Sequence, residues 1–375
     1  MREAPAAPPP AAVALGGVAV LLVVLQGTGG FTVELLGVDL LLAVVGFRVT
    51  HALLEGAMAG GTGRLPLGAW YGHQLASRVP LLVVVLAIVL AVAAAGRRDP
   101  AGQAGLDVLT GAIPLGNWWE LAGRTGLLEP LGPARDWYAD RPGTIDPLGL
   151  LWLVGLLAQL AVLWPLVLAP LRRLVRARTR RDLLRRLLPV LLLTGYLVWL
   201  VGPLRSASGA TLAELALGTH VRAAEFLLGA VAATVVVGLR DRPVSRPVAP
   251  LLALLGTAVL VGMAVLAVRQ PAEWLRSGGP TGAALGGALL LLAAQLPADG
   301  PVGSALGRGL PLELGRSAYP LLVLHLPVFW LIQQGVPTVR PAALAVAGTA
   351  LAWLIGLLLQ DGLVRRWRAR RQPVA

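Results

Sequence analysis

The sequence has no cysteine and no lysine, and only 14% of its residues are charged. Without cysteine the chain can form no disulfide, no thiolate metal site and no cysteine nucleophile. All 32 basic residues are arginine, against 19 acidic residues, so the net charge is +13. Such an excess could indicate a nucleic-acid surface. In a chain with long apolar runs it is more typical of cytoplasmic membrane loops, with arginine replacing lysine in a high-GC genome, so we expect no nucleic-acid partner.

Charge is absent altogether from six long segments of 18 to 25 residues, at 147–171, 187–204, 249–268, 277–298, 317–339 and 341–360. A helix needs about 20 apolar residues to cross the hydrocarbon core. Only helices and closed barrels satisfy their backbone in lipid, and these segments lack the alternation of barrel strands. The sequence therefore predicts an all-α, polytopic integral membrane protein whose immediate partner is the lipid bilayer.

The apolar pattern divides into ten candidate spans, at 12–28, 33–53, 79–96, 147–170, 187–204, 220–239, 250–268, 280–297, 318–336 and 341–360. A further stretch at 108–119 is too short to cross, and its tryptophans suit the headgroup level, so it is expected to be re-entrant or interfacial. The first run ends LQGTGG without an A-x-A-like cleavage site, so we interpret it as a retained span rather than a signal peptide.

The distribution of arginine predicts the orientation. Residues 172–186 hold eight arginines and one aspartate and should be cytoplasmic. Counting from there places the loop at 54–78 and both termini inside, provided that 97–146 lies outside. No internal repeat is evident, so the repeat signature of many secondary transporters is missing. The expected regions are a disordered tail at 1–12, a transmembrane domain at 13–362 with an extracytoplasmic segment at 97–146, and a basic cytoplasmic tail at 363–375.

Ionisable residues inside the spans are candidates for function, because they are costly at membrane depth unless paired or hydrated. Asp39 lies about a turn and a half into its span, so it needs a donor from another helix. Arg222 and Glu225 are three residues apart and can share a helical face. Arg48 approaches the inner surface, where arginine can extend to water. No metal site is expected, because the histidines show no ligand spacing, at His51, His73, His220 and His325.

Several strings resemble motifs of the acyltransferase 3 family. GVDLLLAVVGFRVT at 37–50 resembles its G-V-D-x-F-F-x-x-S-G-F-x-I-T stretch. Further matches follow in family order at GRLPLGAWYGHQLASRVP (63–80), DPLGLLWLVGLLAQLAVLWPLVL (146–168), GTHVRAAEFLLGA (218–230) and LGRSAYPLLVLHLPV (314–328). Each string is weak by itself, but the series covers residues 15 to 360 at family spacing.

This resemblance implies a membrane O-acyltransferase that takes acyl groups from cytoplasmic acyl-CoA and transfers them to extracytoplasmic sugars, lipids or polyols. It implies acyl-CoA as a donor substrate rather than a bound cofactor, and a cell-envelope glycan or lipid as acceptor partner. It also implies ten spans with both termini inside. The candidate catalytic residues are His73, His325 and Asp39. The candidate donor-binding residues are Arg78, His73 and Arg222.

The sequence departs from the family at positions of chemical importance. The family's first span carries an arginine and, eleven residues later, a histidine thought to be the base; these correspond here to Gly16 and Gly27, or to Gln26 after a one-residue shift. Other family positions for arginine, histidine, glutamate and serine are occupied by His73, Gln74, Ser77, Leu150, Leu157, Ala158 and Val45. The retained positions are Asp39, Gly46, Phe47, Trp152, Gln159, Trp164, Pro165, Arg222, Tyr319, His325 and Pro327.

Three functions therefore stay open. The chain could be an acyltransferase in which His73 or His325 replaces the missing base and Arg78 assists with the phosphates of coenzyme A. It could be a pseudoenzyme that keeps the fold and binds a lipid, a glycan or a partner protein. It could also be transporter-like. In each case we expect a multi-pass protein of the cell membrane, in the plasma membrane of a high-GC bacterium.

Overall fold

The computed structural model describes residues 7–28, 36–59, 65–96, 115–124, 145, 147–242, 244–245, 247–296 and 300–359. Every regular element within these ranges is helical, in agreement with the predicted fold class. The elements in chain order are α1 Pro10–Gln26, α2 Leu36–Ala59, α3 Leu67–Gly96, α5 Gly116–Arg124, α6 Leu151–Leu174, α7 Arg180–Asp182, η2 Leu183–Leu187, α8 Leu188–Ala207, α9 Leu212–Leu217, α10 Thr219–Leu239, α11 Val248–Arg269, α12 Pro271–Arg276, α13 Gly279–Gln295, α14 Pro301–Leu306, α15 Gly309–Arg316, α16 Ala318–Gly335, α17 Pro341–Ala343 and η3 Leu344–Gly348.

Seven helices in the described part of the chain are long and apolar enough to cross a membrane. The pair α15 and α16, bent by 71° at its break, would make an eighth. The apolar helices α1 and α13 are shorter, with 17 residues each. Each of the ten predicted spans coincides with one of these helices. The structure confirms a multi-pass helical protein, and the count of ten stays a prediction.

Parts of the predicted organisation fall outside the described residues. These parts are residues 1–6, residues 360–375, Glu34 and most of the segment 97–146, including most of the stretch at 108–119. Within that segment the structure describes α5, which carries the tryptophan pair of the NWWE string.

The loop expected at 54–78 is much shorter in the structure, so this boundary was wrong. Helix α2 continues to Ala59, and α3 already begins at Leu67. The residues after Leu67 contain no proline before Pro80, which the helix accommodates in its interior. His73 and Arg78 therefore lie on a helix and not in a loop.

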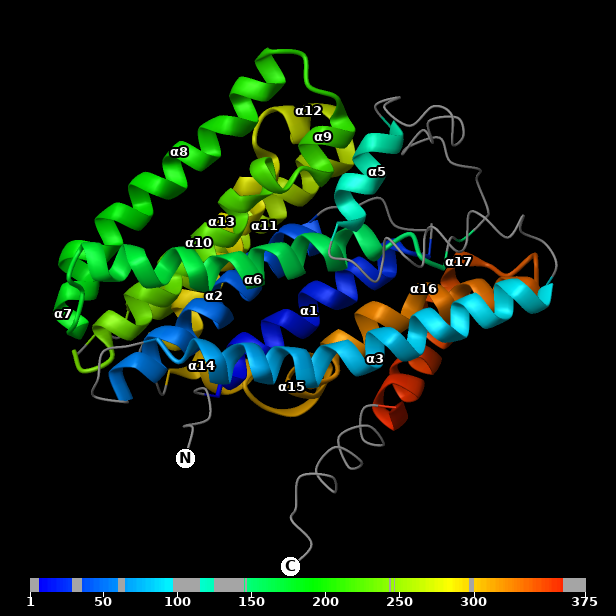
Figure 1. Cartoon of the computed structure of the whole chain (residues 1–375), viewed down its shortest axis with the longest axis horizontal. Coiled ribbons are helices and arrows are strands. Elements are labelled where there is room, and N and C mark those ends of the chain that lie inside the picture. The colour runs from blue at the N-terminus through cyan, green and yellow to red at the C-terminus, as the bar shows by residue number, and fades with distance from the viewer. Residues whose placement is uncertain are drawn as a thin grey trace, which may run out of the picture.

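Helix α2 forms the centre of the bundle. In its most apolar window 94% of the residues are buried inside the protein, against 11% for α8 and for α11. Helix α10 packs along α2, and α1, α13 and α6 cover its other sides. Helix α8 runs along the edge from α7, at the left of Figure 1, to α9 and α12 at the top. The ionisable residues of α2 are thus enclosed by protein rather than by lipid.

Glycines allow α2 and α10 to approach closely. A Cβ on Gly229 of α10 would overlap the carbonyl oxygen of Ala43, and one on Gly46 of α2 would overlap the carbonyl oxygen of Phe226. Small residues at such crossings let backbones touch, which is how helices associate where lipid removes the hydrophobic driving force. The retained Gly46 therefore has a packing role at the central crossing.

We predict that Gly229→Ala will lower the free energy of unfolding by about 1–3 kcal/mol, the usual cost of overpacking. The matched control is Gly262→Ala on α11, where an added Cβ meets no atom within 4 Å. Alanine there should be neutral or slightly stabilising, because it favours helix more than glycine does. Thermal unfolding of both variants in detergent provides the measurement, and equal shifts would contradict the close crossing.

Candidate functional site

A buried polar cluster joins α2, α10 and α13. The guanidinium of Arg222 pairs with the carboxylate of Asp39, and both side chains are 0% exposed. Glu225 lies one turn along α10, with 3.8 Å between its Oε2 and the Nε of Arg222. Thr281 of α13 donates a hydrogen bond of 3.0 Å to Glu225. The donor that Asp39 was expected to need from another helix is therefore Arg222.

Two carboxylates share one guanidinium in this cluster, and no solvent reaches Asp39 or Arg222. A buried ion pair of this kind fixes the relative position of its helices, since separating the partners would leave a charge in a low-dielectric interior. The Asp39–Arg222 pair is therefore suited to holding α2 and α10 together where they cross. Neither Asp39 nor Arg222 lines the pocket at the end of α6 or the one between α3, α6 and α16.

His325 of α16 has the geometry of a potential base. It is 0% exposed, and its Nδ1 lies 2.9 Å from the carbonyl of Leu322 and 3.2 Å from that of Leu321. Carbonyl oxygens only accept hydrogen bonds, so Nδ1 carries the proton and Nε2 holds the lone pair. Among the described residues, Nε2 has no hydrogen-bond partner. A Cβ on Gly27 of α1 would lie 3.2 Å from Nε2, so the unprotonated nitrogen faces this glycine.

A pair of arginines lies near Gly16, about three turns from Gly27 along α1. A Cβ on Gly16 would lie 3.8 Å from a terminal nitrogen of Arg48. Arg48 is close enough to Arg78 of α3 for their charges to repel each other. Arg78 lies over the ring of Tyr319, 5.7 Å from its centroid, and its carbonyl accepts a 3.0 Å hydrogen bond from the Tyr319 hydroxyl. Within the described residues neither Arg48 nor Arg78 has a carboxylate partner.

His73 lies away from these groups. Its side chain is exposed on α3, and its carbonyl accepts a 2.7 Å hydrogen bond from Ser77. The structure thus brings Asp39 together with Arg222, and places Arg78 near Arg48, but it does not place His73 beside His325. From the sequence we expected Arg48 to extend to water at the end of its span. No pattern in the sequence indicated its contact with α1.

The retained Trp164 connects α6 to the central helices. Trp164 donates a 2.7 Å hydrogen bond from Nε1 to the hydroxyl of Thr50. Its indole packs edge-on against Phe226 at a centroid distance of 5.8 Å. Trp164 therefore positions α6 against both α2 and α10.

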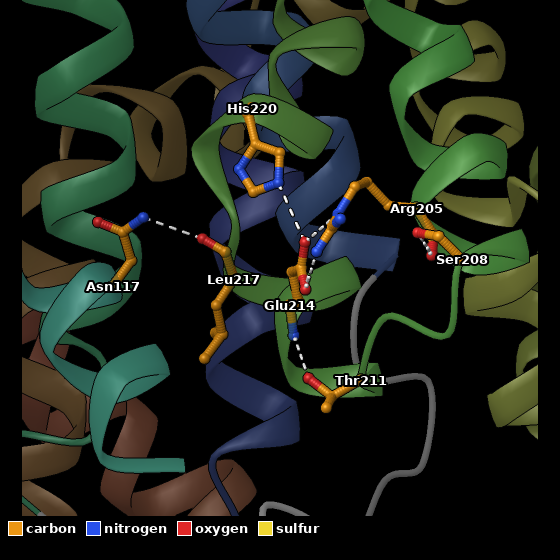
Figure 2. A network of polar contacts seen from close by, with 7 residues as sticks. All are labelled: Asn117, Arg205, Ser208, Thr211, Glu214, Leu217 and His220. Carbon is orange, nitrogen blue, oxygen red and sulfur yellow. Dashed lines mark hydrogen bonds and ion pairs between the residues drawn. The ribbon is translucent and has the colours of Figure 1, made fainter. Parts of the chain in front are cut away.

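A second polar network lies at the opposite end of the bundle from α7. Gln159 of α6 donates to Asn117 at 2.7 Å and accepts from Thr219 at the same distance and from Trp118 at 3.1 Å. Asn117 in turn donates a 2.9 Å hydrogen bond to the carbonyl of Leu217 (Figure 2). The retained Gln159 thus ties α5, α6 and the start of α10 together.

The same network continues to α8 and α9. Glu214 accepts hydrogen bonds of 2.6 and 3.1 Å from Arg205, and its carboxylate lies 3.3 Å from Nε2 of His220 (Figure 2). His220 stacks on Trp118, with ring centroids 5.7 Å apart. These contacts were missed from the sequence, because the partners are separated by up to 102 residues and follow no recognised motif.

Comparison with protein families gives a match over nearly the whole chain. Residues 6–360 match the family model described as an acyltransferase domain. The comparison with curated proteins found no match. The comparison with solved structures found none either.

We predict an asymmetric response to mutation of the buried cluster. Arg222→Met leaves two carboxylates without a cation and should cost about 3–5 kcal/mol of stability. Asp39→Asn should cost less, because Arg222 keeps Glu225 as a partner. The double variant Arg222→Met/Asp39→Asn should recover part of the loss of Arg222→Met. Thermal unfolding in detergent measures all three, and equal losses for the two single variants would contradict a shared guanidinium.

Proposed function

Because the chain belongs to the acyltransferase 3 family, we propose that it is an active membrane acyltransferase. Its donor is acyl-CoA from the cytoplasm, and its acceptor is a hydroxyl of an extracytoplasmic sugar, lipid or polyol of the cell envelope. The arginine-rich end with α7 faces the cytoplasm, so that α9, α12 and α5 lie at the outer surface. With α1 and α13 counted as spans, the chain crosses the plasma membrane of a high-GC bacterium ten times, with both termini inside.

One observation carries this proposal. The two family positions that are vacated on α1, Gly16 and Gly27, are each contacted by a side chain of the missing type from another helix. Arg48 of α2 reaches the position of Gly16, and His325 of α16 reaches that of Gly27. A guanidinium and an imidazole therefore occupy the places where α1 would otherwise supply them. This favours a rearranged active site over a pseudoenzyme, which would have no need of either replacement.

The proposed chemistry follows from these positions. Nε2 of His325 takes the proton of the acceptor hydroxyl as its oxygen attacks the thioester carbonyl. The carbon–sulfur bond then breaks, and the thiolate of coenzyme A takes the proton back from the imidazolium. Arg48 and Arg78 stabilise negative charge on the donor side, because neither is neutralised by a carboxylate. Gly16 and Gly27 are eleven residues apart, so the arginine and histidine contacts lie roughly 16 Å apart along α1.

Purified protein tests the proposal directly. Acetyl-CoA and longer acyl-CoA probes should bind in calorimetric titration, and they should release free thiol when the protein is in detergent with envelope glycans or lipids as acceptors. Neither binding nor thiol release with any probe would overturn the proposal in favour of the pseudoenzyme. Flux of labelled substrate into liposomes without acyl transfer would instead favour a transporter.

We predict that His325→Ala lowers kcat by a factor of about 10² to 10⁴, the usual contribution of a general base. The double variant His325→Ala/Gly27→His should recover part of this activity, since it returns an imidazole to the same place from α1. His73→Ala serves as the control and should leave kcat unchanged, because the side chain of His73 is exposed on α3 whereas that of His325 is fully buried. Thiol release under saturating acyl-CoA provides the measurement. A loss with His73→Ala and none with His325→Ala would reverse the assignment.

An analogous exchange tests Arg48. We predict that Arg48→Gln weakens acyl-CoA binding about tenfold or more, since a charge-assisted hydrogen bond contributes roughly 1.5–3 kcal/mol. Gly16→Arg in the same chain should restore affinity from α1. Calorimetric Kd values for the single and double variants provide the measurement. Unchanged Kd for Arg48→Gln would exclude it from donor binding.

A further inference from the structure

A pocket of about 150 Å³ opens at the arginine-rich end of the bundle, where α6 ends and α3 begins. Four arginines line it, together with Leu65 and Leu67, and these are Arg172, Arg173, Arg176 and Arg178. No acidic residue is among the residues that line this pocket. It lies apart from the interior groups around α1 that the proposed chemistry uses.

Other arginines at this end of the bundle are neutralised. Arg180 and Arg240 bind the carboxylate of Glu55, at 3.1 and 2.8 Å. Arg180 also contacts Asp241 at 3.1 Å, and Arg186 lies 3.5 Å from Asp182. These three carboxylates are therefore occupied by arginines outside the pocket.

Three of the four pocket arginines have no such partner in the part of the chain that the structure describes. Among the described residues, Arg173, Arg176 and Arg178 form no ion pair with any carboxylate. Like charges concentrated in a hollow without counter-ions create a potential that attracts an anion. Three of the four arginines that line the pocket thus carry a charge that no described carboxylate neutralises.

The backbone of the pocket is strained at Arg176. Its φ is 53°, and it is the one non-glycine residue with positive φ among those that the structure describes. This position directly follows α6, where helices usually place glycine because a side chain is costly in the left-handed conformation. An arginine at this position lowers the local stability of the backbone. Backbone strain of this kind is found most often at binding sites.

We propose that this pocket binds the phosphate groups at the nucleotide end of coenzyme A. This inference rests on the proposed function, because it takes acyl-CoA as the donor. Guanidinium groups bind phosphate through paired, charge-assisted hydrogen bonds. The volume is below the roughly 300 Å³ at which pockets enclose a whole drug-sized ligand, so it suits phosphate groups and leaves the rest of the donor outside.

A donor that is bound by its phosphates at the pocket points along α3 toward the interior. Leu67 lines the pocket, and Arg78 lies eleven residues further along the same helix α3. That separation is roughly 16 Å along the helix axis. A donor anchored by its phosphates at the pocket can extend its acyl-bearing arm along α3 toward Arg78 and the interior.

The test compares two double variants of equal charge loss. Arg173→Gln/Arg178→Gln removes two pocket guanidiniums, and Arg181→Gln/Arg185→Gln removes two exposed arginines from the adjacent segment. Calorimetric Kd values are measured in detergent for coenzyme A and for dephospho-coenzyme A, which lacks the 3′-phosphate. The pocket variant should weaken coenzyme A binding by at least about tenfold and reduce the preference over dephospho-coenzyme A. The control variant should change Kd less than twofold.

Arg176→Gly gives an independent readout, because it removes one pocket arginine and also relieves the positive φ. We expect a higher Tm together with weaker coenzyme A binding. A merely structural role of Arg176 would raise Tm without changing Kd, and would count against the inference.

The remaining outcomes separate the two proposals. If wild-type protein binds coenzyme A and both double variants bind it equally well, the pocket assignment is overturned while the acyltransferase proposal stands. If wild-type protein binds no coenzyme A, both proposals fail. The anionic lipid phosphatidylglycerol is the competing source of phosphate. Loss of this lipid from the pocket variant in native mass spectrometry, with unchanged coenzyme A binding, would assign the pocket to a lipid headgroup and overturn the inference.

Discussion

The contact between α2 and α10 organises the rest of this protein. Glycines on both helices bring the backbones together, and the Asp39–Arg222 pair closes the contact in the protein interior. In lipid there is little hydrophobic gain from joining helices, so close packing and paired charges must hold them. Because a separated ion pair would leave an unneutralised charge in a low-dielectric interior, this crossing tolerates little movement. Helices α1, α6 and α13 all take their positions from α2.

A rigid centre explains how side chains can be exchanged between helices around α1. Helix α1 packs against α2, α15 and α16. Its glycines face Arg48 of α2 and His325 of α16, and neither of these residues is on α1 itself. An active site depends on where a guanidinium or an imidazole lies, and not on which helix carries it. As long as the helices keep their relative positions, the proposed chemistry survives the loss of both residues from α1.

The arginines of the chain serve at least two physical purposes. Some are tied to carboxylates and join elements, as Arg180 and Arg240 join α7 and the end of α10 to Glu55 of α2. Others pair with no carboxylate among the described residues, and these are Arg48 on α2, Arg78 on α3, and Arg173, Arg176 and Arg178 at the end of α6. The arginines of the first group form ion pairs with acidic residues at that end of the bundle. The charges of the second group can attract an anion such as the phosphates of the proposed acyl-CoA donor.

The sequence by itself determined the helical membrane class, the family and the regions of the apolar helices that the structure describes, because hydrophobic length and local motifs are properties of contiguous residues. It also indicated that Asp39 required a donor and that Arg222 and Glu225 share a face. Only the tertiary structure decided that Arg222 is that donor, that α3 begins twelve residues before the predicted span at 79–96, and that Arg48 and His325 reach the vacated positions on α1. Such contacts join helices that are far apart in the chain, and their distances depend on packing angles that no local pattern encodes.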